Sequence, residues 1–413
     1  MSRLLFVALA GQGHVIPTLP LVAELVRRGH QVQYACGPEL GESVAAAGAR
    51  WVPLPGLPPF SPPPQVGPEV VARWFRHFFA ALAATYPVLL EHCREHRPDG
   101  VVHDATNWPG RLLARRLGLP AVRTVPNLAE NPAYTGVGDA LFTGLEHDPT
   151  MAAFTEDVAA FAAEHDVELD VAATMDVVES LNLVFVPRAF QPAGDTFDER
   201  FLFLGPLLGD RERREAWSPP PGAPVLFVSL GSIFTDRPDF YRTCRDAFAD
   251  GPFHVAMTIG ELDPAELEPL PENVQVRPWF PQLAVLRHAS AFLTHAGMNS
   301  TMEAISYGVP MLAFPQMPEQ VVNADRIVEL GIGRRLDPES LTVETLRLAV
   351  DDLTASTQVA TRLERLRADA RAGGGAVAGA DAIEQHLRQS CRDPDPGSVP
   401  APDRQTSPGG RIP

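Results

Sequence analysis

Short apolar runs alternate with amphipathic segments through most of the chain, and the alternation occurs in two series. A short apolar run is typical of a buried strand, and apolar residues spaced three or four apart are typical of a helix. Strands that alternate with helices form a parallel sheet with helices on both faces. The sequence therefore predicts an α/β fold with two domains, each with its own parallel sheet, which suits a chain of 413 residues.

The first series predicts helices over Leu19–Arg28 and Arg111–Leu117, and strands over Leu4–Leu9, Gln31–Ala35, Gly100–His103 and Ala121–Thr124. A charged, proline-rich segment, Gly205–Ala223, then interrupts the pattern and is typical of an exposed linker. The second series predicts strands over Val225–Leu230, His254–Ile259, Val274–Arg277, Ala291–Thr294 and Met311–Phe314.

These patterns divide the chain into five parts. We expect an N-terminal domain over residues 1–205, an interdomain linker over 206–223 and a C-terminal domain over 224–375. A last helix follows over 376–390. The remaining tail, 391–413, is rich in Pro, Gly and Asp and predicts a disordered segment.

Composition excludes several classes of partner. The formal net charge is −17, from 34 basic and 51 acidic side chains. Nucleic acids and anionic membrane surfaces attract basic proteins, so we expect no nucleic-acid partner. No apolar stretch is long enough to cross a bilayer, which predicts no stable membrane insertion. The chain contains no lysine, which excludes a Schiff-base lysine and a phosphate-binding P-loop lysine.

The cysteines and the N-terminus predict a soluble cytoplasmic protein. The four cysteines are far apart and form no CxxC pair, which suits a reducing compartment and predicts neither disulfides nor a zinc site. The opening MSRLLFVALA imitates a signal peptide, but its apolar run is short and leads into a Gly-rich turn. A buried first strand is the better interpretation.

Two residues at predicted strand ends are candidates for proton transfer. The turn Gly11–Pro17 lacks the third glycine of a dinucleotide fingerprint, so it does not favour NAD. It places His14 after the first strand, and Asp104 follows a later strand. A carboxylate bonded to one imidazole nitrogen fixes the tautomer and raises the basicity of the other nitrogen. The alternatives are a loop histidine that caps its own backbone and an aspartate that caps the next helix.

The run from His295 to Glu303 follows an apolar strand and opens a helix. Asn299, Ser300 and Thr301 have side chains that cap helices, and a helix N-terminus attracts anions. Glu303 lies one turn further on, where it can accept hydrogen bonds from ribose hydroxyls. Trp279 stands between two prolines at a strand end, where its indole can stack on a base. The alternatives are an ordinary capped helix and a tryptophan that fills the core.

Aromatic insertions in the first half indicate an apolar wall around an acceptor. Val71–Leu90 predicts an aromatic helix, and Asn131–Ala173 is a second, Ala- and Phe-rich insertion. Long insertions at the binding edge of a sheet often form pockets, although extra core packing is the alternative. The candidate acceptor-binding residues are Phe60, Trp74, Phe78, Phe79, Asn107 and Trp108.

Several ordered motifs resemble one known family. The segments WFPQ, HAGMNSTMEA, GVPML and Pro318–Gln320 are similar to the donor-binding signature of the UDP-dependent family 1 glycosyltransferases. The chain looks most like the bacterial macrolide-type (MGT-like) members. With the Gly11–Pro17 turn, His103–Asp104 and Ser229–Ser232, the resemblance runs from about Arg3 to Leu387. It implies the GT-B fold, in which two Rossmann-like domains with parallel sheets face each other across a cleft.

The resemblance also implies residue roles. His14 would be the catalytic base and Asp104 its partner. Trp279 would stack on the uracil with Gln282 nearby, and Glu303 would hold the ribose. His295, Gly297, Asn299, Ser300 and Ser232 would hold the diphosphate, and Ser229, Gly231 and Phe280 are further candidate donor-binding residues. Glu319 and Gln320 would bind the sugar hydroxyls, although many relatives have Asp where Glu319 stands.

The implied reaction transfers a sugar, glucose by family habit, from a UDP-sugar to a hydroxyl of a hydrophobic natural product such as a macrolide. The configuration would invert, and the role would lie in antibiotic biosynthesis or in self-resistance and inactivation. The one DxD motif, Asp393-Pro394-Asp395, lies in the tail, so we expect no metal and no cofactor besides the donor substrate. The alternatives are a nucleotide-sugar epimerase and a non-catalytic helper of a glycosyltransferase. The sequence is compatible with a monomer or a homodimer.

Overall fold

The computed structural model describes residues 1–8, 11–56, 68–106, 108–136, 149–169, 178–211, 216–232 and 234–390. For residues 68–71, 74 and 149–153 it describes the backbone alone. The tail over 391–413 and the candidate residues Phe60 and Asn107 lie outside the described residues, as does the side chain of Trp74.

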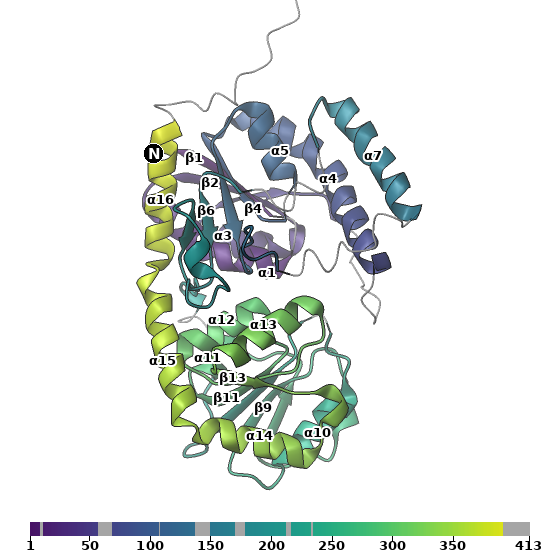
Figure 1. Ribbon diagram of the computed structural model, residues 1–413, viewed down its shortest axis with the longest axis vertical. Helices are drawn as coiled ribbons and strands as arrows, with labels where there is room; N and C mark the ends of the chain where they lie inside the picture. Colours follow the sequence, from purple (N-terminus) through teal and green to yellow (C-terminus); the bar gives the residue numbers. More distant parts are fainter. Residues whose placement is uncertain are drawn as a thin grey trace, which may run out of the picture.

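The chain forms two α/β domains that lie one above the other along the long axis of the molecule (Figure 1). The N-terminal domain has seven parallel strands in the order β3-β2-β1-β4-β5-β6-β7. They are β1 Arg3–Val7, β2 Gln31–Cys36, β3 Arg50–Pro53, β4 Gly100–Asp104, β5 Ala121–Val125, β6 Asn182–Val184 and β7 Phe201–Phe203. The strand order reverses between β1 and β4. The segments that follow these two strands therefore border one crevice, where open α/β sheets bind ligands.

The C-terminal domain repeats this plan with six parallel strands in the order β10-β9-β8-β11-β12-β13. They are β8 Val225–Ser229, β9 His254–Thr258, β10 Val274–Arg277, β11 Ala289–Thr294, β12 Met311–Ala313 and β13 Gly333–Arg335. Every residue of β8 and β9 is buried, as expected for parallel strands covered on both faces. Here the order reverses between β8 and β11, so the segments after these strands share the second crevice.

Helices connect and cover both sheets. Those of the N-terminal domain are α1 Gln12–Val15, α2 Leu19–Arg27, α3 Gly41–Ala46, α4 Pro68–His96, α5 Trp108–Leu117 and α7 Pro149–His165, with short 3-10 turns η1 Ile16–Thr18, η2 Pro38–Leu40 and η4 Gly194–Thr196. Those of the C-terminal domain are α10 Pro238–Phe248, α11 Gln282–Leu286, α12 Met298–Tyr307, α13 Pro318–Glu329, α14 Val343–Ala355 and α15 Thr357–Ala372, with η5 Pro264–Leu267 and η6 Pro338–Ser340. Within the described parts of the chain, none of the helices has the length and apolarity needed to cross a bilayer.

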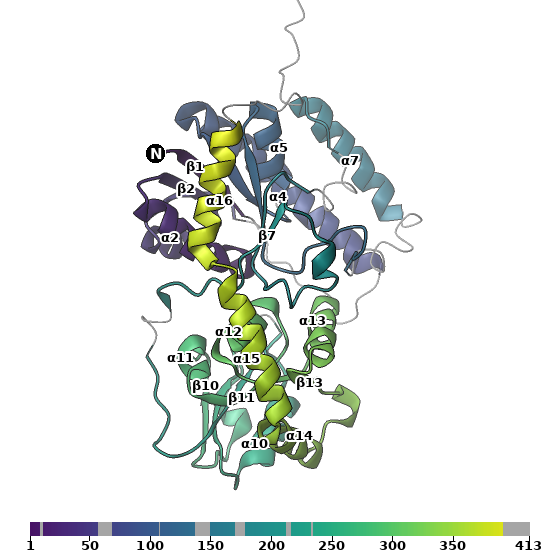
Figure 2. The ribbon, with the colours of Figure 1, turned by 60° about the vertical axis from the view of Figure 1, so that its left-hand side comes forward.

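The last helix, α16 (Gly375–Ser390), returns to the N-terminal domain. Figure 2 shows α15 beside the lower domain and α16 beside the upper one. Ala380, Ile383 and Leu387 are buried in the same core as α2. At the edge of this contact, Arg28 pairs with Asp381 at 2.6 Å. Two different segments therefore join the domains, which the position of this helix in the sequence does not indicate.

The two segments that join the domains touch each other where the chain passes from one domain to the other. One segment begins at Leu204 and Gly205, and the other lies at the end of α15 and the start of α16. Gly205 has a φ of 72°, and a Cβ there would collide with the carbonyl oxygen of Ala370. A Cβ on Gly373 would lie 2.6 Å from the carbonyl of Leu204. The backbone N–H of Gly375 donates to Leu204 O at 3.2 Å. The close approach of these backbones requires glycine at both crossings.

Candidate active site

His14 lies in the short helix α1, directly after the end of β1. The turn into this helix passes through Gly11, whose φ of 67° favours glycine. His14 Nδ1 lies 2.9 Å from Asp104 Oδ2, and the two side chains are 17% and 1% exposed. The structure thus brings together the two residues that the sequence predicted as a pair, at the point where the first sheet reverses its strand order.

Asp104 is held from its other side by a residue that sequence analysis did not single out. The backbone N–H of Thr106 donates to Asp104 Oδ1 at 2.9 Å, and its hydroxyl donates to the same oxygen at 2.6 Å. These bonds form a local turn typical of an aspartate followed two residues later by Thr. The Asp-x-Thr spacing was the signal available in the sequence. Among the described residues, Asp104 thus bonds to His14 through one carboxylate oxygen and to Thr106 through the other.

The electrostatics of this pair favour a basic imidazole. Burial disfavours the imidazolium, but the charge and hydrogen bond of Asp104, with the charge of Glu319, outweigh burial and raise the pKa of His14. Burial likewise opposes ionisation of Asp104, but His14 and Thr106 outweigh it and lower the pKa of Asp104. An ionised carboxylate accepts the Nδ1–H of the neutral ring, which leaves Nε2 as the proton acceptor.

His295 follows β11 and lies between two glycines. A Cβ on Gly231, whose φ is 82°, would lie 2.8 Å from the ring, and a Cβ on Gly297 would collide with Nε2. Burial lowers the pKa of His295 to about 4, although a hydrogen bond with the Ser229 backbone acts in the opposite direction. His295 is therefore neutral near pH 7 and can offer an N–H donor but no positive charge. Ser229 is itself buried, whereas Ser232 is exposed.

The loop around His295 contains a strained residue that its neighbours stabilise. Ala296 has a φ of 61°, in the left-handed region that costs a non-glycine residue about 1–2 kcal/mol. The buried Asn323 donates from Nδ2 to Ala296 O at 2.9 Å. The backbone N–H of Ala296 donates to Thr294 Oγ1 at 3.2 Å. These contacts fix the path of the backbone into α12.

The N-cap residue of α12 is Gly297, and within the described residues no side-chain capping bond is found at this N-terminus. The expectation that Asn299, Ser300 and Thr301 supply capping bonds is therefore wrong. Ser300 Oγ instead accepts from Gln282 Nε2 at 3.0 Å. An uncapped helix N-terminus directs its N–H groups and the positive end of its dipole at any anion placed there. The glycine cap thus suits an anion site better than a side-chain cap would.

Asn299 connects the two domains. Its Nδ2 donates to the backbone oxygen of Gly13 at 3.0 Å, across 286 positions of sequence. Gly13 precedes His14, so the start of α12 lies against the turn that carries the imidazole. The charge of Glu319, an exposed residue in the first turn of α13, also acts on His14. The site residues of the two sheets therefore face each other.

Glu303 is buried within α12, and both of its carboxylate oxygens have partners. Gln282 Nε2 donates to Oε2 at 2.5 Å. The same Nε2 donates to Ser300 Oγ, so Gln282 holds these two side chains of α12 in place. Arg211 Nη1 donates to Oε1 at 3.2 Å. Arg211 comes from the segment that joins the domains, and sequence analysis gave it no role. Near α13, Gln320 Oε1 accepts from the backbone N–H of Gln316 at 2.8 Å.

Two neighbouring aromatic residues differ sharply in exposure. Trp279 is 63% exposed, which leaves an indole face open to a base. Phe280 is 1% exposed and packs against Trp217 and Phe227. Its predicted place at the donor is a correction, because a side chain enclosed in the core cannot contact a ligand there. The same motif therefore supplies one residue to the surface and one to the core.

Of the three aromatic side chains expected at the acceptor and described by the structure, one lies in the core and two are partly buried. Trp108 is 1% exposed and stacks on Phe75 with ring centroids 6.1 Å apart. Phe79 meets Phe154 edge-on at 5.6 Å. Phe78 and Phe79 are only partly buried. The structure therefore corrects the role predicted for Trp108, which fastens α5 to α4, and leaves the partly buried pair as candidates.

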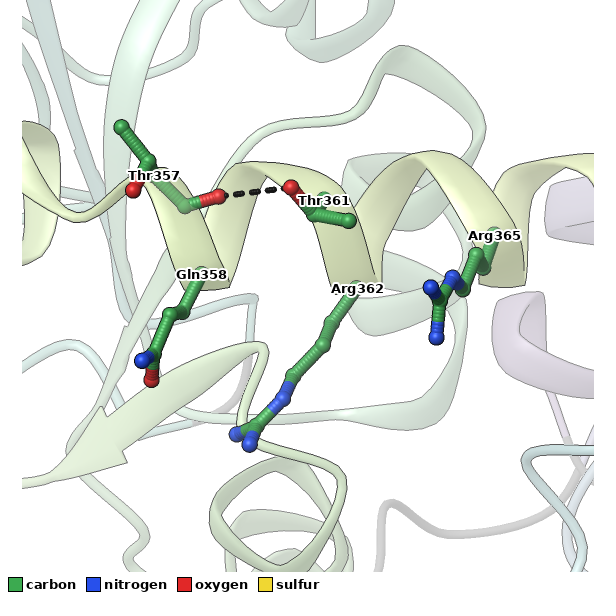
Figure 3. A pocket seen from close by; sticks show the side chains of 5 residues that line it. All are labelled: Thr357, Gln358, Thr361, Arg362 and Arg365. Carbon is green, nitrogen blue, oxygen red and sulfur yellow. Dashed lines mark hydrogen bonds between the residues drawn. The ribbon is translucent and has the colours of Figure 1, made fainter.

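A small pocket lies along α15, and Figure 3 shows the side chains that line it. Its lining comes from that helix alone: Thr357, Gln358, Thr361, Arg362 and Arg365. The guanidinium of Arg362 lies over Gly331, where a Cβ would have no room. The pocket contains none of the predicted site residues. Among the described residues, no three His, Cys, Asp or Glu side chains gather as metal ligands.

Comparison with known proteins gives a consistent family. Residues 213–370 match the family described as UDP-glucoronosyl and UDP-glucosyl transferase. The chain is 38% identical over 394 residues to the oleandomycin glycosyltransferase of Streptomyces antibioticus, covering 92% of this chain and 90% of that one.

Two solved structures are similar throughout. The glycosyltransferase of kitacinnamycin matches with a TM-score of 0.86 at 37% identity, over 94% of this chain and 99% of its own. The calicheamicin glycosyltransferase CalG4 matches with a TM-score of 0.81 at 36% identity, over the same shares. The protein therefore belongs to the family 1 UDP-glycosyltransferases, with the GT-B fold that the sequence predicted and with natural-product glycosyltransferases as its relatives.

Proposed function

We propose that the protein transfers glucose from UDP-glucose to a hydroxyl group of a hydrophobic natural product, with inversion at the anomeric carbon. The acceptor class is a macrolide or a related polyketide antibiotic. The observation that carries this proposal is the His14–Asp104 pair, held at 2.9 Å. The pair lies beside the uncapped N-terminus of α12, to which Asn299 connects it.

In the proposed mechanism, the acceptor hydroxyl binds at Nε2 of neutral His14. As its oxygen attacks the anomeric carbon, the hydroxyl proton moves to Nε2 and the bond from that carbon to the diphosphate breaks. Attack from the face opposite the leaving group converts an α-linked donor into a β-glycoside. The imidazolium that forms is stabilised by the ionised carboxylate of Asp104.

The leaving diphosphate gains negative charge in this step. The N–H groups at the start of α12 and a neutral N–H of His295 are placed to stabilise it. Preorganised donors of this kind are often the largest single contribution to catalysis. The proposal includes no metal ion and no cofactor, so UDP-glucose is the only nucleotide required.

The uracil, the ribose and the sugar of the donor are assigned to residues by the chemistry of their side chains. Trp279 offers an exposed indole face to the uracil, and Glu303 accepts from the ribose hydroxyls. Uridine has two ribose hydroxyls that can donate to this carboxylate, which favours UDP over dTDP as the nucleotide. Glu319 and Gln320, in the first turn of α13, are assigned to the sugar hydroxyls.

The acceptor class is supported by the relatives, since the oleandomycin and calicheamicin glycosyltransferases are named for antibiotics. Their names are those of transferases, which does not favour an epimerase or a helper protein. The proposed role is antibiotic biosynthesis or self-resistance, in the cytoplasm.

The test is to incubate the protein with a panel of nucleotide sugars and polyketide antibiotics and to detect products by mass spectrometry. We expect a mass gain of one hexose with UDP-glucose and at least one macrolide. Proton NMR of that product should show a β-linkage. Release of free sugar with no glycoside across the whole panel, or an α-linked product, would contradict the proposal.

A further inference from the structure

Arg211 lies in the first of the two segments that join the domains, residues 206–223, which we call the joining segment. Its side chain contacts the carboxylate assigned to the ribose. Its Nη1 donates to Glu303 Oε1 at 3.2 Å, across 92 positions of sequence. The side chain of Glu303 is 8% exposed, whereas that of Arg211 is 36% exposed. The carboxylate of Glu303 is therefore buried, and the guanidinium of Arg211 lies on its solvent side.

The joining segment is fixed to the C-terminal domain near this site. Trp217 packs on His254 with ring centroids 6.0 Å apart, and edge-on against Phe280 at 6.2 Å. Phe280 is the neighbour of the exposed Trp279. Arg211 and Trp217 thus both contact the C-terminal domain.

A buried carboxylate needs a partner to remain ionised, because burial disfavours its charge. Gln282 supplies a neutral donor to Oε2, and Arg211 supplies a positive charge at Oε1. A carboxylate oxygen can accept more than one hydrogen bond, so a ribose hydroxyl can be added beside Arg211 without displacing it. The two donors also fix the rotamer of Glu303 before the nucleotide arrives, which reduces the entropy lost on binding.

We propose that Arg211 is a positioning residue of the donor site, which holds the carboxylate of Glu303 in the orientation that the ribose requires. The inference rests on the proposed assignment of Glu303 to the ribose. It makes nucleotide recognition depend on a residue of the joining segment, outside the motifs of the C-terminal domain.

The test is calorimetric titration of UDP into the full-length protein and its variants. Arg211→Gln should weaken UDP binding about 3- to 10-fold, as expected for a partly exposed charged hydrogen bond. Arg211→Lys should recover part of the loss. In a Glu303→Gln background, Arg211→Gln should add no further loss, because Arg211 acts through the carboxylate. Arg334→Gln, which removes an exposed ion pair with Asp352 in the same domain, is the matched control and should bind UDP normally.

The outcomes separate the inference from the proposed function. Unchanged or tighter UDP binding by Arg211→Gln, with an unchanged melting temperature, would overturn the positioning role. An equal loss in the wild-type and Glu303→Gln backgrounds would overturn it as well, because Arg211 would then act on the nucleotide directly. If Glu303→Gln itself bound UDP like the wild type, the ribose assignment and the inference would fail together.

Discussion

In the N-terminal domain the candidate site consists of two side chains 90 residues apart, whereas in the C-terminal domain it is spread over several motifs, from Ser229 to Gln320, around the start of α12. Both sites lie where their sheet reverses its strand order. In the proposed mechanism, the N-terminal domain supplies one atom, Nε2 of His14, for proton transfer. In the same proposal, donor binding in the C-terminal domain is divided among backbone N–H groups, glycines and several side chains. Single substitutions should therefore cost most in the N-terminal domain and affect turnover there, while those in the C-terminal domain should affect donor affinity.

The largest expected effect comes from removal of the base. His14→Ala should lower turnover by about two to four orders of magnitude, because no other group would accept the acceptor proton. Steady-state kinetics with saturating donor measures this effect. His92→Ala, which alters a histidine of α4 bonded to Gln33, is the matched control and should remain active. Near-normal turnover of the His14 variant would mean that the base lies elsewhere.

The next effect concerns Asp104. Asp104→Asn should lower the maximal rate by about 10- to 1,000-fold, because an amide stabilises the imidazolium poorly. Since Asp104 raises the pKa of His14, and the base works only when deprotonated, the acid limb of kcat/KM should move to lower pH. A pH profile of both proteins measures the shift. Movement of the limb to higher pH would argue against the pair.

A smaller effect is expected at Thr106. Thr106→Val removes the hydroxyl bond to Asp104 and keeps the backbone bond, so turnover should fall only about 2- to 10-fold. Thr106→Ser keeps the hydroxyl and should behave like the wild type. If the valine variant were as impaired as Asp104→Asn, Thr106 would do more than orient the carboxylate.

The smallest expected effect is that of a chelator. With the diphosphate held by the start of α12, activity after EDTA treatment and gel filtration should be unchanged. Rates measured before and after treatment, and after addition of magnesium or manganese, test this. A strict requirement for either metal would contradict the assigned diphosphate site.

The sequence predicted nine of the strands, including the short β10 and β12, since buried parallel strands are nearly continuous apolar runs. It did not predict β3, β6, β7 and β13, whose three or four residues are too few for a periodicity to decide. The return of α16 to the N-terminal domain was also missed. That contact depends on tertiary packing of Ile383 and Leu387, and any apolar helix face could have formed it.

For the site, the His14–Asp104 pair was predictable because strand ends of one parallel sheet meet at one edge. Arg211 was not, because its partner lies 92 positions away and the surrounding segment has the composition of a linker. Phe280 and Trp108 were assigned wrongly because an aromatic residue at a strand or helix end can turn either way. Only the fold shows which side is covered.

The central claim, that one domain binds the nucleotide and the other supplies the base, is tested most directly by calorimetric titration of UDP into two full-length variants. Trp279→Ala should lose roughly 1–3 kcal/mol of binding free energy, as base–aromatic stacking contributes in single-strand binders. His14→Ala should bind UDP like the wild type. Normal binding by the Trp279 variant together with lost binding by the His14 variant would contradict this division between the domains.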